Sequence, residues 1–304
     1  MAAGDAHAGL AGPRPRQPRL ARDAPRTDPT RTTSGGHDDM STSIHVGIGG
    51  WNFEPWRETF YPKDLPASRE LEYASRQLSA IEVNGTYYAT FKPATFAKWR
   101  DTAPEGFVFS LKANRFATNR RVLAEAGESV TRFVDSGVAE LGPKLGPIVW
   151  QFATTKRFDP VDFGAFLKLL PKASAGVPLR HALDVRHESF RSPEFLAMAR
   201  DHGAGVVFTE SDDYPPIPDL TTDFVYTRVM RTRSELVTGV TEEELDGLAA
   251  SASRWESGGQ PDRLPLVEAD RTPPKRARDV FVFFISGAKE RAPAAAMALI
   301  ERLS

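Results

Sequence analysis

Residues 82–88 concentrate more chemistry than a packed strand end requires. The segment follows an apolar, β-rich run and carries a carboxylate at Glu82, an amide at Asn84, a hydroxyl at Thr86 and a phenol at Tyr88. Because side chains alternate along a strand, Glu82 and Asn84 face away from the aliphatic residues on either side of Glu82. Such groups exchange protons and hydrogen-bond substrates, so the pattern predicts a reaction or binding site here.

Ionisable and amide side chains also stand near the carboxyl ends of the β-rich runs that follow. They are Lys112, Gln151, Asp184, Arg186 and Arg228. With Glu82 they supply two negative and three positive charges. This balance favours an anionic substrate, because arginine pairs well with carboxylate and phosphate groups.

We predict catalytic roles for Glu82, Asp184 and Lys112. The two carboxylates are the acid–base candidates, because different neighbours can give them different protonation states. Lys112 also forms an anion clamp with Arg186 and Arg228. Substrate-binding roles are predicted for Asn84, Thr86, Tyr88, Gln151, Arg186, Arg228 and Trp51. A purely structural ion network is the alternative, but buried ion pairs contribute little to stability and ionisable groups cluster at functional sites.

The sequence specifies neither a cofactor nor a metal. The absence of cysteine excludes disulfides, thiolate catalysis and cysteine-ligated zinc or iron–sulfur sites. The glycines of residues 47–50 resemble a dinucleotide-binding loop only superficially, because no helix follows directly. No ligand spacing demands the set of residues that a metal site would have to combine, which is Glu82, Asp184, His187, Glu210 and Asp212. We therefore assign no metal site and leave the cofactor unknown.

Eight β-rich runs must position these side chains, and helical patterns separate most of them. The runs cover residues 44–48, 80–83, 107–111, 146–151, 180–185, 205–209, 224–228 and 280–284. Alternation of strands and helices over residues 44–304 predicts an α/β fold, a single-domain TIM (β/α)8 barrel, whose active sites lie at the carboxyl ends of the strands. A doubly wound open sheet is the competing topology.

Several helices have recognisable starts. Asp159-Pro160 and Ser192-Pro193 each combine a capping residue with proline in the first turn, and Gly203 is placed to end the second of these helices. Thr241 and Glu244 form a capping-box pattern. Further helices are expected over residues 70–77, 94–101, 130–140 and 292–302. An insertion is expected near residues 257–275, with a brief extended piece over residues 264–267.

Residues 1–43 are expected to be a disordered tail rich in arginine, proline and alanine, and Met40 is an alternative start of the chain. The longest apolar run, residues 280–285, is too short to span a membrane. A net charge of −1 gives no global attraction to nucleic acid, so nucleic acid is a less favoured partner than a small anionic substrate. The lack of cysteine suits the cytoplasm, and no obligate protein partner is indicated.

Several motifs resemble the YecE-like family, also called domain of unknown function 72. They occur in order across residues 44–303 and are Gly49–Phe53 with Trp56 and Phe60–Pro62, Glu82–Tyr88, Phe107–Lys112, Lys144–Pro147 leading to Gln151, and Asp184–His187. The resemblance implies a TIM barrel and no particular reaction. It makes the following residues the family-type residues of the barrel mouth: Glu82, Asn84, Thr86, Tyr88, Lys112, Gln151, Arg186 and Arg228.

The chain departs from the family pattern at several positions. Asp184 replaces a glutamate, which keeps the charge and shortens the reach. The other departures are Phe190 for a tryptophan, Phe152-Ala153 for two prolines, Thr209-Glu210 for Ala-Asp, Met230-Arg231 for His-Gly, and Ile285-Ser286 for an asparagine pair. A divergent member with a shifted substrate or a lost reaction is therefore expected.

Three functions are consistent with these residues. The leading one is an enzyme that acts on a small anionic or polyhydroxylated substrate at the carboxyl-terminal barrel mouth. The second is a metal-dependent phosphodiester hydrolase or sugar isomerase, by analogy of fold alone. The third is a non-catalytic barrel that binds a ligand or nucleic acid at its mouth and at the basic loop of residues 228–233.

Overall fold

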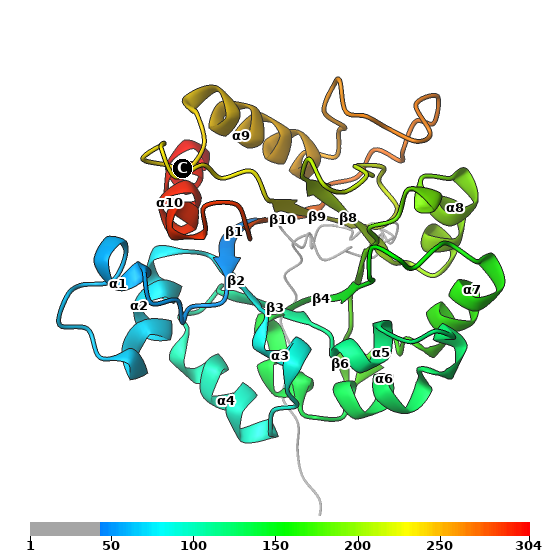
Figure 1. Ribbon diagram of the computed structural model, residues 1–304, viewed down its shortest axis with the longest axis horizontal. Helices are drawn as coiled ribbons and strands as arrows, with labels where there is room; N and C mark the ends of the chain where they lie inside the picture. Colours follow the sequence, from blue (N-terminus) through cyan, green and yellow to red (C-terminus); the bar gives the residue numbers. More distant parts are fainter. Residues whose placement is uncertain (1–42) are drawn as a thin grey trace, which may run out of the picture. The chain divides into compact units, whose positions relative to one another are not determined.

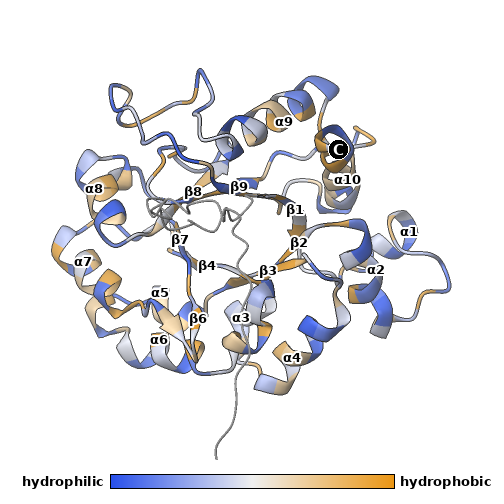
Figure 2. Cartoon of the chain, turned by 180° about the vertical axis from the view of Figure 1, so that it is seen from behind, coloured by the Kyte–Doolittle hydropathy of each residue, from blue (hydrophilic) through white to orange (hydrophobic). Residues whose placement is uncertain are grey.

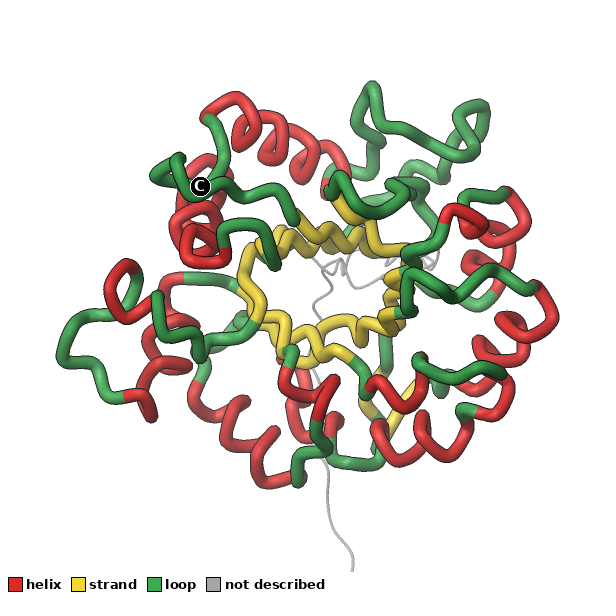
Figure 3. The backbone as a smooth tube through the Cα atoms, viewed as in Figure 1, coloured by secondary structure: helices red, strands yellow, loops and turns green. Residues whose placement is uncertain are grey.

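Eight parallel strands close into a barrel in the computed structural model, which describes residues 43–304 (Figures 1 and 3). The strand order is β1-β10-β9-β8-β7-β4-β3-β2. The strands are β1 (Ile44–Gly49), β2 (Ala80–Val83), β3 (Val108–Lys112), β4 (Leu145–Gln151), β7 (His181–Asp184), β8 (Gly205–Glu210), β9 (Phe224–Val229) and β10 (Asp279–Phe284). The TIM-barrel prediction is confirmed, and the open sheet is excluded. The predicted tail up to residue 42 and the alternative start at Met40 lie outside the described residues.

Helices surround the barrel (Figure 3). The longer ones are α2 (Glu70–Gln77), α4 (Pro93–Thr102), α6 (Gly127–Val134), α7 (Pro160–Leu169), α8 (Pro193–Asp201), α9 (Glu242–Glu256) and α10 (Ala292–Leu303). Single-turn helices are α1 (Trp56–Thr59), α3 (Gly85–Tyr88) and α5 (Arg115–Thr118). Turns of 3-10 helix are η1 (Ala67–Arg69), η2 (Leu123–Glu125), η3 (Val138–Lys144), η4 (Glu188–Phe190) and η5 (Lys289–Arg291). No helix within residues 43–304 combines the length and apolar character needed to cross a bilayer.

Two apolar layers position the site. The strand residues predicted to face the helices, such as Ile81, Phe109 and Trp150, are completely buried in the large core between barrel and helices. The alternate residues, such as Ala80 and Val149, belong to a second cluster inside the barrel. Figure 2 shows hydrophilic residues on the helices α2, α4 and α9 outside these layers. The alternation of the sequence therefore sends the polar residues at the strand ends toward the barrel axis.

The predicted helix starts are confirmed. The Asp159 carboxylate accepts hydrogen bonds from two backbone amides at the start of α7, and the Ser192 hydroxyl accepts one at the start of α8. Gly203, with a φ of 64°, follows the end of α8. Both hydrogen bonds of the capping box join Thr241 and Glu244 ahead of α9.

Replacing Thr241 with alanine is expected to lower the free energy of unfolding by about 1 kcal/mol. The backbone amide of Glu244, which donates to the Thr241 hydroxyl at 3.2 Å, would lose its acceptor. Urea denaturation measures the change. The variant Thr241→Ser keeps the hydroxyl and is the control; an equal loss in both variants would contradict the capping role.

Three segments differ from the predictions. The helix expected over residues 130–140 ends at Val134, because Gly137 takes a left-handed φ of 113° and begins a separate 3-10 turn. No strand forms over residues 264–267. This insertion is held instead by Asp219, whose carboxylate accepts from the backbone amides of Val267 and Glu268, each at 2.9 Å. A short antiparallel pair, β5 (Ala173–Ser174) with β6 (Val177–Pro178), was not predicted.

Candidate functional site

Two carboxylates and one guanidinium meet inside the barrel at the carboxyl ends of β2, β7 and β9. Arg228 Nη2 donates to Glu82 Oε1 at 2.9 Å, and Arg228 Nη1 donates to Asp184 Oδ2 at 2.6 Å. The side-chain exposure is 1% for Arg228 and 0% for both carboxylates. Both terminal nitrogens of Arg228 are therefore bound by the protein itself. We call Glu82, Asp184 and Arg228 the ion triad.

Two uncharged residues extend the ion triad. The Tyr226 hydroxyl donates to Glu82 Oε2 at 2.7 Å and lies 2.8 Å from the Ser110 hydroxyl. Burial raises the pKa of Tyr226 well above its usual value, and the Glu82 carboxylate adds to this effect. The phenol therefore stays protonated and donates. Sequence reasoning missed both residues, although each lies two positions before a predicted inward residue, Arg228 or Lys112, and thus on the same face.

Arg186 joins the ion triad to the edge of the mouth. Its Nη2 donates to Gln151 Oε1 at 2.8 Å and to Asp184 Oδ2 at 3.0 Å. Its guanidinium carbon also lies 4.3 Å from the centre of the Tyr214 ring. Burial alone would raise the pKa of Asp184, but the charges of Arg228 and Arg186 outweigh burial and hold that pKa below its usual value. Asp184 is therefore ionised at neutral pH and serves as the counter-charge of Arg228 and Arg186.

Lys112 has a different environment from the arginines. Among the ion pairs and hydrogen bonds of residues 43–304, none involves its ammonium nitrogen, which lies 4.2 Å from the centre of the Tyr87 ring. The residue is only 7% exposed. Burial is the main cause that lowers the pKa of Lys112 to about 8; the charge of Arg228 lowers it as well, whereas Glu82 and Asp184 oppose this change. Lys112 can therefore gain or lose a proton close to neutral pH.

The remaining predicted binding residues make their contacts outside the ion triad. The buried Thr86 hydroxyl lies 2.7 Å from the Lys112 carbonyl and 2.9 Å from the Val83 carbonyl, so it fixes the turn into α3. Tyr88 is 64% exposed. Trp51 packs edge-on against a helix residue, Trp99, with the ring centres 5.3 Å apart.

Asn84 lies close to the mouth, and its side chain occupies space that a glycine of β1 leaves open. Its side-chain nitrogen is 3.4 Å from the Glu82 carbonyl. A Cβ atom at Gly49 would approach that nitrogen to 3.0 Å, so the glycine makes room for the amide. The structure thus brings Glu82, Lys112, Gln151, Asp184, Arg186 and Arg228 together, with Asn84 beside them. Their catalytic and binding roles stay predictions.

The residues considered for a metal site do not converge on one point, and several already bind other groups of the protein. In the described residues no three histidine, aspartate or glutamate side chains are placed to hold a metal ion. His187 accepts from the Ser189 amide through Nδ1 and caps η4. Asp212 pairs with Arg231 at 3.2 Å. Burial raises the pKa of Glu210, against the opposing effect of Arg231.

The basic loop of residues 228–233 does not present free arginines. Arg228 belongs to the ion triad, Arg231 pairs with an aspartate, and Arg233 pairs with Glu244. Each positive charge of the loop is thus matched by a carboxylate. The role of this loop in binding nucleic acid stays a prediction.

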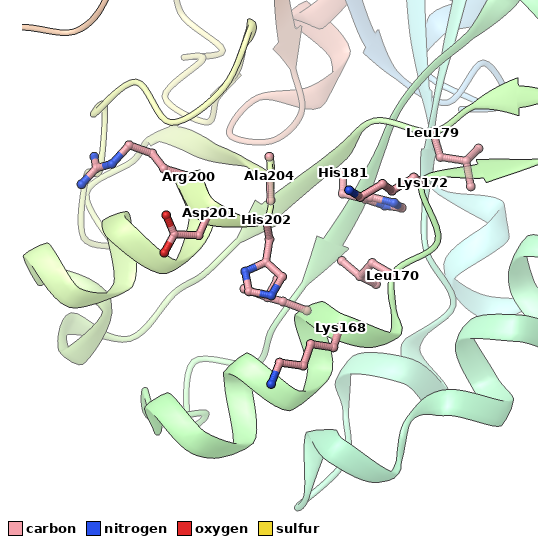
Figure 4. Close-up of a pocket in the computed structure, with 11 residues that line it drawn as sticks. Lys168, Leu170, Lys172, Leu179, His181, Arg200, Asp201, His202 and Ala204 are labelled. Carbon is pink, nitrogen blue, oxygen red and sulfur yellow. The ribbon is translucent and has the colours of Figure 1, made fainter.

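A cavity of about 590 Å³ lies at the other end of the barrel, between the last turns of α7 and α8 and the start of β7. Figure 4 shows Lys168 and His202 beside it. Its buried histidine, His181, is already bound: Nδ1 accepts from Trp150 at 3.0 Å and Nε2 donates to the Pro171 carbonyl at 2.8 Å. We place the candidate site at the mouth, where the charged groups converge.

Comparisons with known proteins agree with the barrel architecture. A family described as "Protein of unknown function DUF72" matches residues 45–304. The UPF0759 protein YunF of Bacillus subtilis (strain 168) is 25% identical over 158 residues, which cover 50% of this chain and 54% of that protein. The chain therefore spans about half the length of this curated relative.

Solved structures show the same fold. A DUF72 family protein from Thermotoga maritima superposes with a TM-score of 0.65 at 22% identity, over 86% of this chain and 99% of that chain. A DUF72 family protein from Enterococcus faecalis gives 0.63 at 17% identity, over 86% and 95%. The structure of SacUVDE gives 0.50 at 11% identity, over 86% and 98%. At these identities the likeness concerns the fold and not the reaction.

Proposed function

Since the chain belongs to the DUF72 family, whose solved members share its barrel, we propose that it is an enzyme acting on a small anionic, oxygen-rich substrate at the carboxyl-terminal barrel mouth. The observation that carries the proposal is Lys112, a nearly buried ammonium that no described carboxylate pairs with. An unpaired buried cation is costly, and it is usually retained where a ligand or a proton transfer uses it.

The charge balance at the mouth supports an anion. Glu82 and Asp184 contribute two negative charges, and Arg228 with Arg186 contributes two positive charges that these carboxylates bind. The remaining charge is the positive charge of Lys112. A carboxylate or phosphate group of a substrate would complete the balance and recover part of the desolvation cost.

The proposed division of roles follows from these contacts. Lys112, with a pKa of about 8, exchanges a proton with the substrate, which is efficient when the pKa lies near the working pH. Gln151 accepts from Arg186 through its carbonyl oxygen, so its amide hydrogens are directed to a substrate oxygen. The charges of the ion triad, held in fixed positions, set the electrostatic field at the place of the reaction.

Thermal shift with inorganic phosphate, citrate and a panel of phosphorylated and carboxylated metabolites tests the proposal. We expect at least one anion at saturating concentration to raise the Tm of the wild-type chain by about 5 °C or more. The variant Lys112→Met should lose most of that shift. Lys98→Met removes the same charge from an exposed position on α4 and is the matched control.

Different outcomes separate binding from catalysis. Equal shifts in wild type and Lys112→Met would contradict the proposal. Lys112→Arg keeps the charge but cannot lose a proton, so it should keep the shift and lose turnover of any substrate that the panel identifies. A shift produced by Mn, Zn or Mg alone would favour the metal-dependent alternative, which stays a prediction.

A further inference from the structure

Five cationic side chains lie together on the loops that follow β3 and β4, on the same face as the barrel mouth. They are Arg115, Arg120, Arg121, Lys156 and Arg157. None of them takes part in an ion pair among residues 43–304, whereas Arg228, Arg231 and Arg233 of the loop after β9 all do. Three of the five, Arg115, Arg121 and Arg157, are exposed. We call these five residues the cationic loops.

The cationic loops line two adjoining hollows. Arg120, Arg121, Lys156 and Arg157 line the larger hollow, of about 540 Å³. Arg120 also lines a second hollow of about 350 Å³ together with Phe116, so the two hollows share this arginine. Four of the five cations line the larger hollow, and together with Arg115 of the single-turn helix α5 (Figure 1) they make up what we call the strip.

The carboxylates of the larger hollow do not neutralise the strip. Asp159 accepts from the backbone amides of Val161 and Asp162. Asp162 accepts from the backbone amides of Leu123 and Ala124. Both carboxylates hold the ends of the loops. Two of the cations hold the loops as well: Arg120 donates to the Phe116 carbonyl at 2.9 Å and to the Ser129 hydroxyl at 2.8 Å, and Lys156 donates to the Arg121 carbonyl at 2.8 Å. Arg115, Arg121 and Arg157 are exposed and are the cations most accessible to a ligand.

Exposed aromatic rings stand at one end of the strip. Tyr88 is 64% exposed and Phe116 is 62% exposed, which is high for such large apolar side chains. The guanidinium carbon of Arg115 lies 5.8 Å from the Tyr88 ring centre and 5.6 Å from the Phe116 ring centre. Arg115 therefore forms a platform with two rings that have open faces.

We propose that the cationic loops, with Tyr88 and Phe116, bind single-stranded nucleic acid. Unpaired cations along a strip suit successive phosphates, and aromatic rings beside an arginine are surfaces on which unpaired bases stack. A double helix keeps its bases stacked inside and offers the rings nothing to contact. An acidic peptide would use the cations and leave the rings without a role. Of the residues predicted from sequence to bind substrate, this surface uses Tyr88. It uses neither Lys112 nor Gln151 nor the ion triad, so the losses expected for Arg121→Ser/Arg157→Ser are independent of the small-anion proposal.

Fluorescence anisotropy of the full chain with labelled dT15 and U15 at 50 mM salt tests the proposal. Five phosphate contacts predict a slope of log K against log salt of about −3.5. Arg121→Ser/Arg157→Ser should weaken binding at least tenfold and reduce the slope to about −2. Tyr88→Ala/Phe116→Ala should weaken binding about fivefold or more and leave the slope unchanged.

The matched control is Lys168→Ser/Lys172→Ser, which removes two exposed charges beside the cavity at the other end of the barrel (Figure 4). We expect it to bind as the wild type does. Absence of binding to both oligonucleotides, or equal losses in the control and in Arg121→Ser/Arg157→Ser, would overturn the proposal. Tighter binding to a duplex, or no effect of removing the rings, would overturn the assignment to single strands.

Discussion

Replacing Arg228 with methionine is expected to lower the free energy of unfolding by about 3–5 kcal/mol. The change leaves Glu82 and Asp184 fully buried without the guanidinium that binds both. Their attraction to Arg228 offsets their desolvation, and without it two like charges face each other inside the barrel. Urea denaturation measures the loss, and failure to fold is its extreme form.

Two further variants define the cause of this loss. Arg69→Met removes an arginine from an exposed pair, in which Arg69 and Glu72 are 2.9 Å apart, and should leave stability nearly unchanged. The triple variant Glu82→Gln/Asp184→Asn/Arg228→Met removes every charge of the ion triad and should recover part of the loss. If Arg228→Met is as stable as Arg69→Met, the ion triad does not hold the barrel interior as described.

Replacing Lys112 with methionine is expected to raise the free energy of unfolding at pH 7 by roughly 3 kcal/mol. The folded-state pKa of Lys112 is lowered to about 8 from a usual value of 10.5. Below pH 8 the folded chain therefore carries the full cost of a charged, buried ammonium, which methionine does not have. Between pH 8 and 10.5 the unfolded state binds more protons than the folded state, so the wild type gains stability as the pH rises.

Denaturation at pH 7 and at pH 10 tests this prediction. The gain from Lys112→Met should shrink as the pH rises, whereas Lys98→Met should show no such trend. If Lys112→Met is more stable than the wild type and its Tm no longer rises when an anion is added, Lys112 is kept for function at the expense of stability. Loss of stability at pH 7 would instead show that the ammonium has a structural partner.

The number and order of the strand and helix patterns predicted the barrel, and the alternation of polar and apolar residues along each strand predicted the face on which the charged residues meet. Ile81 and Glu82 show why this works. Successive side chains on a strand point to opposite faces, so Ile81 faces the helices and Glu82 faces the barrel axis. The same argument applies to Asp184 and Arg228. These positions depend on local geometry, which a single sequence encodes directly.

The partners of each charge could not be predicted in this way. Arg228 binds Glu82 and Asp184 from across the barrel, because strand order and barrel width bring their side chains together. Lys112 lies on the same inward face, yet no carboxylate among the described residues forms an ion pair with it. The alternation of residues along a strand cannot distinguish Lys112 from Arg228 in this respect. Thr86 was predicted to bind substrate, but the chain turns into α3 directly after Asn84 and places the hydroxyl against backbone carbonyls.

The ion pair between Glu82 and Arg228 joins two residues that the ribosome adds at well-separated times. Their positions are 146 residues apart, and β2 is not a neighbour of β9 in the sheet. During synthesis the residues up to β7 emerge first and contain both carboxylates of the interior. Arg186 follows directly and pairs with Asp184, whereas Arg228, the guanidinium that binds Glu82, has not yet been made. A partial barrel that buried Glu82 would enclose a carboxylate without its ion-pair partner. The strands made first therefore gain this stabilisation of the interior only when β9 arrives.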